Sequence, residues 1–375
     1  MGVTCVVMLA VILTSVLIVA PADLAADSKQ TAPPVVTGSV AAKLSPDEIF
    51  DLQKRADSGD AAAQYALGRA YEHGNGVPLR ADQAAIWYRK AAEQGNDKAQ
   101  NGLGVLYWFG EGVERDKTEA VRWYRKAARQ GNADAMFNLG AAYYNGEGVG
   151  PDDNLAFAWF LLSSEAGNSS GQDAAKRSKA EHNPADFAYA CVTIGQMYLK
   201  GDDLSKNTTL AASWYRKAAE KGSGDAALHL GALYLDTSDY TQARPWCEAA
   251  SKQRLGGAYW CLGYLYQHGY AVAENPKEAF HWYEQGAHER NEASMLALAH
   301  MYENGAGTKP DRIQAFVWYL LAAERGDKSA AAEAKRIRSS MTQKEWKDTK
   351  KKLPISINAN KVESFLQGNP QPTNP

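Results

Sequence analysis

The chain has 375 residues, of which 45% are hydrophobic and 22% charged, and its formal net charge is −2. This balance is typical of a globular protein, and it excludes both a disordered chain and a strongly basic nucleic-acid-binding protein. Alanine, glycine, tyrosine and tryptophan are abundant. They suit closely packed helices, because small residues let helices approach and aromatic rings fill the gaps between them.

The N-terminus begins with an uncharged, apolar run over residues 3–20, followed by Ala20-Pro21-Ala22. Small residues at this spacing are typical of a cleavage site, so residues 1–22 are predicted to be a secretory signal peptide. No Lys or Arg precedes the run, and its length approaches that of a membrane span, so an uncleaved membrane anchor is the alternative. We therefore expect a periplasmic or secreted protein, or one anchored to a membrane by residues 3–20.

Residues 23–44 are rich in Pro, Ala, Ser and Val, and they are expected to form a flexible linker. A helix is predicted to begin directly after the linker. Ser45 can cap it, Pro46 suits its first turn, and Glu48 stands three residues beyond the cap. This helix aligns with the second half of the repeat that follows, so we expect it to cap the N-terminal end of a repeat array.

Self-similarity at a period of 36 residues is the main feature of the sequence. Three copies follow one another in register, and three further copies and one shortened copy of 32 residues occur later. The copies are Gly59–Gln94, Gly95–Gln130, Gly131–Ala166, Asp186–Lys221, the short Gly222–Gln253, Arg254–Glu289 and Arg290–Arg325.

Each copy predicts two helices joined by a turn. In the first copy, Ala63, Leu67 and Tyr71 recur every four residues on one helical face. The tract Gly-Asn-Gly-Val at 74–77 then ends the helix, because glycine tolerates the left-handed conformation that a helix end needs. Residues 84–92 form the apolar stripe of a second helix. One such pair cannot bury its own apolar face, so we expect an all-α solenoid of about seven antiparallel helix pairs.

The pattern Leu-Gly-x-x-Tyr at residues 67–71 resembles the tetratricopeptide repeat. The Gly-x-Gly-Val turn, with Trp-Tyr-Arg-Lys-Ala-Ala at residues 87–92, resembles its Sel-one-like repeat (SLR) subclass more specifically. The resemblance covers about residues 59–325. It implies a right-handed superhelix and a scaffold or adaptor of a type that bacteria often export, and it names no partner.

The similarity between residues 156–162 and 315–321 suggests that one repeat array ends within the chain and a second one follows. Both segments are apolar and aromatic, and both are followed at the same offset by Ala-Lys-Arg. The later segment closes the repeats, so the earlier one looks like a copy of a terminal cap. Two arrays are therefore predicted, residues 45–183 with the N-terminal cap helix and residues 184–341. An ordinary inserted helix is the alternative.

Residues 342–375 are predicted to form a basic helix, to about residue 352, and then a disordered tail rich in Asn, Gln and Pro. The lysines of the helix, at positions 344, 347 and 350–352, could contact acidic lipid or polymer. A solvated helix face is the alternative and the more favoured interpretation.

The sequence contains no catalytic motif that we can identify. It lacks a Gly-x-Ser-x-Gly elbow, a phosphate-binding glycine loop with Lys, and a His-Glu-x-x-His motif. The seven histidines show no metal-ligand spacing. We therefore expect no enzyme, no metal and no cofactor. A cell-wall-directed enzyme is the least favoured alternative, because the Ser-x-x-Lys spacing it would use is wrong at Ser213 and at Ser340.

Three cysteines follow the N-terminal segment: Cys191, Cys247 and Cys261. Some secreted relatives of the SLR type link the two helices of one repeat by a disulfide, but Ala219 stands where the partner of Cys191 would be. Cys247 and Cys261 take the places of a Tyr and an Ala on neighbouring predicted helices, so they either form a disulfide or are small buried residues. Pro245 is expected to kink the helix that carries Cys247.

The first helices of the pairs are expected to line a concave surface, by analogy with tetratricopeptide repeats. Several positions on this surface carry aromatic side chains where only solvent or a partner should be, which usually marks an interaction surface. The predicted partner-binding residues are Tyr65, Arg69, Trp108, Phe109, Phe137, Tyr144, Trp260, Tyr264, His268 and His300. The alternative is that these rings pack on neighbouring helices.

We expect a protein or peptide as the partner and no nucleic acid. A polysaccharide held by the aromatic residues is the alternative ligand. Contact with a membrane is expected only through an uncleaved N-terminal segment, and the oligomeric state is left open.

Overall fold

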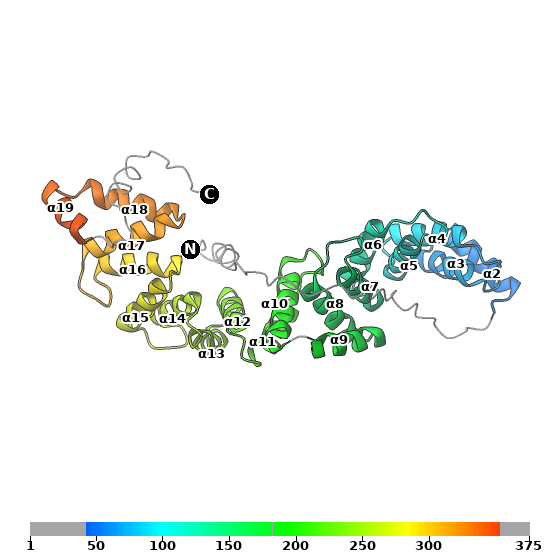
Figure 1. Cartoon of the computed structure of the whole chain (residues 1–375), viewed down its shortest axis with the longest axis horizontal. Helices are drawn as coiled ribbons and strands as arrows, with labels where there is room; N and C mark the ends of the chain where they lie inside the picture. The colour runs from blue at the N-terminus through cyan, green and yellow to red at the C-terminus, as the bar shows by residue number, and fades with distance from the viewer. Residues whose placement is uncertain (1–42, 182, 353–375) are drawn as a thin grey trace. The chain divides into compact units, whose positions relative to one another are not determined.

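The computed structural model describes residues 43–181 and 183–352, and within them the chain is helical (Figure 1). Eighteen helices, α2 to α19, follow one another in this part of the chain, and no strand occurs among them. The predicted all-α architecture is confirmed. None of the described helices is both long and apolar enough to span a membrane. The predicted signal peptide, the linker up to residue 42 and the tail from residue 353 lie outside the described residues.

The chain divides into two compact units between Lys221 and Gly222. The described part of the first unit holds a cap helix, three helix pairs, a single helix and a fourth pair. These are α2 Pro46–Asp57; α3 Ala61–His73 and α4 Ala81–Glu93; α5 Asp97–Phe109 and α6 Lys117–Arg129; α7 Ala133–Asn145 and α8 Asp153–Glu165; the single α9 Ser169–Glu181; α10 Pro184–Lys200 and α11 Thr208–Ala219.

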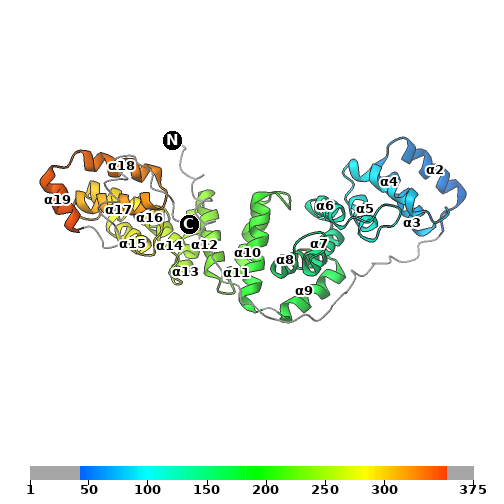
Figure 2. The same ribbon diagram turned by 45° about the horizontal axis from the view of Figure 1, so that its top comes forward.

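The described part of the second unit holds three helix pairs and two closing helices (Figure 2). They are α12 Gly224–Asp236 and α13 Tyr240–Ser251; α14 Gly256–His268 and α15 Pro276–His288; α16 Glu292–Asn304 and α17 Arg312–Glu324; α18 Lys328–Ser339; and α19 Gln343–Lys352. Each predicted repeat is therefore one pair of helices, and successive pairs within a unit pack against one another.

Polar caps and glycines set the ends of these helices. The side chain of Asn96 accepts a backbone N–H of the first turn of α5, and Asp116 caps α6 in the same way. These caps satisfy N–H groups that have no partner within the helix. At the other end of α5, Gly110 has a φ of +76°, in the left-handed region that glycine adopts without strain.

A glycine facing an aromatic ring joins the two helices of a pair. A Cβ atom on Gly104 would lie 2.6 Å from the ring of Tyr124, so only glycine lets α5 and α6 approach this closely. Tyr124 is 1% exposed, and its burial raises the pKa of its hydroxyl. The same contact pairs Gly68 with Tyr88, Gly140 with Phe160, Gly195 with Tyr215 and Gly263 with Tyr283. The repeat is therefore built around one close-packed ring per pair.

The single helix α9 interrupts the regular stack of the first unit. It packs against α7 and α8, much as α18 packs against α17 in the second unit. The helix after it, α10, packs back against α8 and begins the last pair of the unit. The units consequently divide at residues 221 and 222 and not at the predicted 183 and 184, because α10 returns to the surface of α8.

Candidate partner-binding surface

The ten predicted partner-binding residues lie on first helices, as expected, but in two compact units and in very different environments. Six belong to the first unit, on α3, α5 and α7, and four to the second, on α14 and α16. Some are exposed, some are in the core, and only those on α14 form a run of ring contacts with one another.

Trp108 is a core residue, with only 3% of its surface exposed. Its ring packs against Tyr124 of α6, with 6.2 Å between the ring centroids. Two residues that follow α5 approach Trp108 as well. The Lys117 ammonium lies 5.0 Å from the centre of the Trp108 ring, and Arg115 donates a hydrogen bond to the Trp108 carbonyl oxygen at 3.2 Å. The expectation that Trp108 faces solvent is therefore wrong.

Phe137 is also buried, with 6% of its surface exposed. Its ring centroid lies 5.7 Å from that of Phe160 on α8. Ala174 and Ala175 of α9 complete the same apolar cluster. The single helix α9 thus covers the position that Tyr65 occupies, half-exposed, in the first pair. Phe137 cannot be part of a partner-binding surface in this arrangement.

Four predicted residues of the first unit stay at the surface. Arg69 is exposed, and Tyr65 is half-buried with its ring stacked on Tyr88 at 5.8 Å. Partial burial raises the pKa of Tyr65. Phe109 and Tyr144 are 36% and 39% exposed at the C-terminal ends of α5 and α7. Neither of these two rings contacts another aromatic ring within the described residues, so the first unit offers isolated exposed rings.

In the second unit, five aromatic side chains form one continuous group at the surface. This aromatic cluster consists of Trp260, Tyr264 and His268 on α14, Tyr270 in the turn that follows, and Tyr240 at the start of α13. The three residues of α14 recur every four positions, which places them on one side of the helix. His268 is exposed and the other four are half-buried.

The rings of the aromatic cluster touch in sequence. The Trp260 and Tyr264 rings stack with 5.2 Å between centroids, and His268 follows 4.5 Å from Tyr264. Tyr270 lies 5.4 Å from His268. Tyr240 stacks on Tyr270 at 4.1 Å, with an angle of 5° between the ring planes. Because each ring is held by its neighbours, the group is ordered before any partner arrives.

The turn after α14 explains why Tyr270 meets Tyr240. In regular copies, the second glycine of the turn lies against the backbone of the preceding helix pair, at the start of that pair's second helix. A Cβ atom on Gly112, for example, would lie 2.2 Å from the backbone of Ala81. Here Ala271 takes the place of that glycine, with a φ of +56°, and the rings of Tyr240 and Tyr270 stack across the same joint.

Sequence reasoning missed Tyr240 and Tyr270. The detectable feature was a Tyr in the register of Ala81, together with a Tyr where the other turns carry Asn, Glu, Asp or Ala. The same two positions carry the ion pair of Lys117 with Glu147 in an earlier joint, so two aromatic residues there predict a ring contact between repeats.

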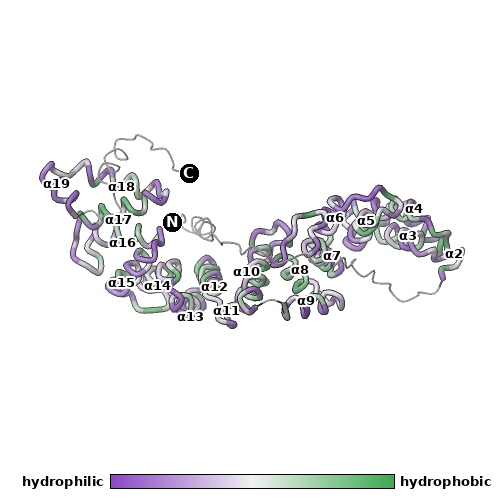
Figure 3. The backbone as a smooth tube through the Cα atoms, in the orientation of Figure 1, coloured by the Kyte–Doolittle hydropathy of each residue, from purple (hydrophilic) through white to green (hydrophobic). Residues whose placement is uncertain are grey.

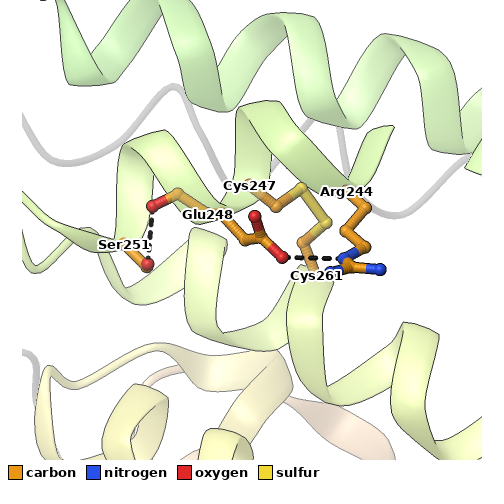
Figure 4. Close-up of a disulfide and its surroundings, with 5 residues drawn as sticks. All are labelled: Arg244, Cys247, Glu248, Ser251 and Cys261. Carbon is orange, nitrogen blue, oxygen red and sulfur yellow. Dashed lines mark hydrogen bonds and ion pairs between the residues drawn. A yellow bond between two sulfur atoms is a disulfide. The ribbon is translucent and has the colours of Figure 1, made fainter. Parts of the chain in front are cut away.

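A disulfide between Cys247 and Cys261 joins α13 to α14 (Figure 4). The two Cα atoms are 6.1 Å apart, and Cys261 directly follows Trp260. Of the two alternatives that the sequence left open for these cysteines, the structure has the disulfide. Helix α13 continues through Pro245 from Tyr240 to Ser251, so the proline does not end it. The remaining described cysteine, Cys191, is buried and free, and burial raises its pKa to about 12.

The surroundings of the disulfide tie α13 to the turn that carries the cluster. Arg244 donates to a Glu248 carboxylate oxygen at 2.7 Å, and the Ser251 hydroxyl donates to the Glu248 carbonyl oxygen at 2.9 Å (Figure 4). Arg244 also donates to the carbonyl oxygen of Ala271 at 3.4 Å. One covalent bond and one side-chain bridge therefore fix the position of the turn.

His300 belongs to a different set of contacts. Its Nδ1 lies 2.7 Å from the hydroxyl of Tyr319, which donates to Glu303 at 2.9 Å. Glu303 in turn pairs with Arg336 of α18. His300 is exposed, but this network joins α16, α17 and α18 and so has a structural role. No group of three or more potential metal ligands occurs among the residues described.

The Sel1 repeat family model matches six segments that together make up more than half of the chain: residues 61–96, 97–132, 133–168, 188–223, 257–291 and 293–327. These segments correspond to the regular helix pairs. The interval between residues 223 and 257 contains α12 and α13, the pair in which Cys247 replaces the core aromatic ring.

Two curated proteins share part of this repeat region. One is the ERAD-associated E3 ubiquitin-protein ligase component HRD3 of Candida glabrata, 32% identical over 101 residues, which are 24% of this chain and 12% of that protein. The other is the chitin synthase regulator SKT5 of Saccharomyces cerevisiae, 33% identical over 94 residues, 23% of this chain and 14% of that protein. The chain thus spans a small part of the length of either relative.

Two similar solved structures are repeat proteins of bacteria. One is c5321, a protective antigen of uropathogenic Escherichia coli with an SLR fold, with 33% identity, a TM-score of 0.42 and coverage of 86% of this chain and 75% of that one. The other is a Sel1 repeat protein from Oxalobacter formigenes, with 25% identity, a TM-score of 0.39 and coverage of 78% and 80%.

Proposed function

The chain belongs to the Sel1 repeat family, and from this premise we propose that it is a non-catalytic scaffold that binds a protein or a peptide. The names of the two curated relatives support a role of this kind, since one is a ligase component and the other a regulator of an enzyme. Both share only a short segment with this chain, so the proposal concerns the class of partner and not its identity.

The aromatic cluster is the observation that carries the proposal. Aromatic rings give a large contact area at a small cost in conformational entropy, and they are enriched among residues that dominate binding energy. The rings here are already ordered by their mutual stacking, and the Cys247–Cys261 disulfide holds the two helices that carry them. A preformed surface loses less entropy on binding, which favours affinity.

We also propose that the protein is exported to the periplasm or secreted. The disulfide supports this location, because such bonds persist in oxidising compartments and are rare in the cytosol. The predicted signal peptide at residues 1–22 supports it as well. Cell fractionation followed by mass analysis of the N-terminus tests the proposal. A mature chain that begins near residue 23 supports export with cleavage, and an intact N-terminus in the membrane fraction supports the anchored alternative.

The partner proposal is tested by affinity capture from an envelope fraction with three forms of the protein. They are the wild type, the cluster variant Tyr264→Ala/His268→Ala, and the first-unit variant Phe109→Ala/Tyr144→Ala as a matched control. We expect one protein to be retained by the wild type and the control and lost from the cluster variant. Circular dichroism must show unchanged helicity in both variants, because Tyr264 is half-buried.

Two other outcomes would redirect the proposal. Loss of the captured protein only from the first-unit variant would place the binding surface at Phe109 and Tyr144. Binding of soluble wall polysaccharide that depends on the cluster, without a captured protein, would favour the polysaccharide module. The structure supports the protein partner better, since the flat faces of Trp260 and Tyr264 are stacked on each other and are less available to a sugar.

A further inference from the structure

The C-terminal cap of the second unit has a charge opposite to that of the repeats. Residues 328–352, which form α18 and α19, contain nine Lys and Arg against three Asp and Glu. Residues 43–327 contain 30 Lys and Arg against 37 Asp and Glu. Figure 3 shows α19 as a mostly hydrophilic helix at this end of the second unit. Positive charge is therefore concentrated in the two closing helices.

One side of α19 is fixed to the repeats. Trp346 is 3% exposed, and its ring meets that of Phe316 on α17 edge to face at 5.8 Å. Thr349 is fully buried beside it. At the start of the helix, Thr342 and Glu345 exchange hydrogen bonds in a capping box. Helix α19 is therefore docked through a defined inner face.

The opposite side of α19 carries a row of lysines. Lys344, Lys347 and Lys351 recur at the three- and four-residue spacing of one helical face, and this face points away from Trp346. We call these three residues the lysine face. All three are exposed. Lys344 and Lys347 form no ion pair with any other residue that the structure describes, while Lys351 lies 3.1 Å from Asp348.

Capping a stack in this protein does not require such a face. Helix α9, which interrupts the regular stack of the first unit after its third pair, has three basic side chains, but two of them are already engaged. Lys176 lies 3.9 Å from Asp173, and the Lys179 ammonium lies 5.5 Å from the centre of the Phe187 ring. The lysine face is an addition to the cap and has no role in its packing.

We propose that the lysine face binds the surface of an anionic phospholipid bilayer. Lysine ammonium groups are point charges on flexible stems, which suit a diffuse layer of phosphates better than a single shaped ligand. Helix α19 contains no Arg for bidentate recognition, and its one aromatic ring, Trp346, is turned inward. The contact is thus electrostatic and reversible, with no residue inserted into the hydrocarbon.

This surface is separate from the aromatic cluster and from the apolar N-terminal segment. It would place the scaffold against a membrane whether or not residues 1–22 are retained, and it leaves the cluster on α13 and α14 for a protein partner. Failure of either proposal leaves the other intact.

Vesicle cosedimentation of the full chain tests the lysine face. Vesicles of phosphatidylcholine alone are compared with vesicles that contain about 30% phosphatidylglycerol, because binding through an apolar segment would be similar on both. The triple variant Lys344→Gln/Lys347→Gln/Lys351→Gln is expected to lose the preference for anionic vesicles by about 100-fold, from about fivefold for each lysine. Raising the salt from about 50 mM to about 500 mM should suppress the same preference.

The matched control removes three charges from the other cap, as Lys176→Gln/Arg177→Gln/Lys179→Gln in α9. It should bind anionic vesicles as the wild type does. Equal loss in both variants would show that net charge alone matters and would overturn the proposal. So would a wild type that does not distinguish the vesicles, or α19-dependent binding of duplex DNA or of an acidic protein without vesicle binding.

Discussion

Successive helix pairs meet at a joint, where the second helix of one pair packs against the first helix of the next. Tyr88 and the Cys247–Cys261 disulfide occupy equivalent positions in two of these joints. A Cβ atom on Gly68 of the same pair would lie 2.6 Å from the Tyr88 ring, and one on Gly102 of the next pair would lie 3.0 Å from it. In the irregular joint, Cys247 takes the place of the ring, and a Cβ atom on Gly231 would lie 2.7 Å from its sulfur.

The partner of Cys247 in that joint is Cys261, which stands in the register of Gly102. The Tyr88 ring packs against its own helix pair and against the next one. In the irregular joint it is replaced by the smaller side chain of Cys247, which is bonded covalently to the next pair. The first joint depends on buried apolar area and close packing. The second depends on a cross-link, so its strength is set by the redox state of its surroundings. Equivalent joints are therefore held by different interactions, packing in one and a covalent bond in the other.

The largest expected effect is the loss of a packed ring. Tyr124→Ala should lower the free energy of unfolding of the first unit by about 4 kcal/mol, because a fully buried aromatic side chain leaves a cavity between two pairs. Urea denaturation followed by circular dichroism measures it. Tyr144→Ala is the control, since its ring is 39% exposed and its loss should cost less than about 1 kcal/mol. Similar values for the two variants would contradict the role of the ring.

The second effect concerns the cross-link. Reduction of the wild type, or Cys247→Ala/Cys261→Ala, should lower the free energy of unfolding of the second unit by about 3 kcal/mol, the cost expected for a loop of about 15 residues. The measurement is denaturation with and without reductant. The double variant should not respond to reductant, and a wild type that is equally stable when reduced would show that the bond contributes little.

A conversion variant sharpens the comparison further. Cys247→Tyr/Cys261→Gly rebuilds the Tyr88 and Gly102 arrangement in the irregular joint. Its free energy of unfolding should come within about 1 kcal/mol of the oxidised wild type and should not depend on reductant. If it is less stable than Cys247→Ala/Cys261→Ala, then the space around Pro245 differs from that around Tyr88 and the joints are not interchangeable.

The smallest effect is a pH dependence of the irregular pair. Burial lowers the pKa of His229 on α12 below its usual 6.5, with Asp225 opposing the shift. The unfolded chain therefore binds a proton more readily than the folded one. The contribution of a neutral His229 is present above pH 6.5 and is lost as the pH falls toward the lowered pKa.

Denaturation at a series of pH values should show this loss as less than about 1 kcal/mol, and His229→Gln should reduce it. His281→Gln, a substitution of the same kind at an exposed histidine of the second unit, is the control for the replacement itself. An identical pH profile for wild type and His229→Gln would contradict the assignment.

The repeat period by itself determined most of the local structure. Apolar spacing and the glycine tracts predicted each helix pair, because helix formation and termination depend on residues close together in the chain. The same register placed Cys247 opposite Cys261, since positions at a fixed offset meet in every joint. Here the sequence left two alternatives, and the structure decided for the disulfide.

Only the tertiary structure decided which aromatic residues reach the surface. Trp108 and Tyr144 stand at the same position of successive copies, yet they are 3% and 39% exposed. Lys117 lies over the Trp108 ring and Arg115 binds the Trp108 carbonyl oxygen, whereas the corresponding positions after α7 carry an aspartate and a proline. The boundary between the two compact units also depends on a tertiary contact, the packing of α10 against α8. Whether a side chain is buried depends on which residues pack over it. The repeat period describes only residues close together in the chain, so it does not specify these contacts.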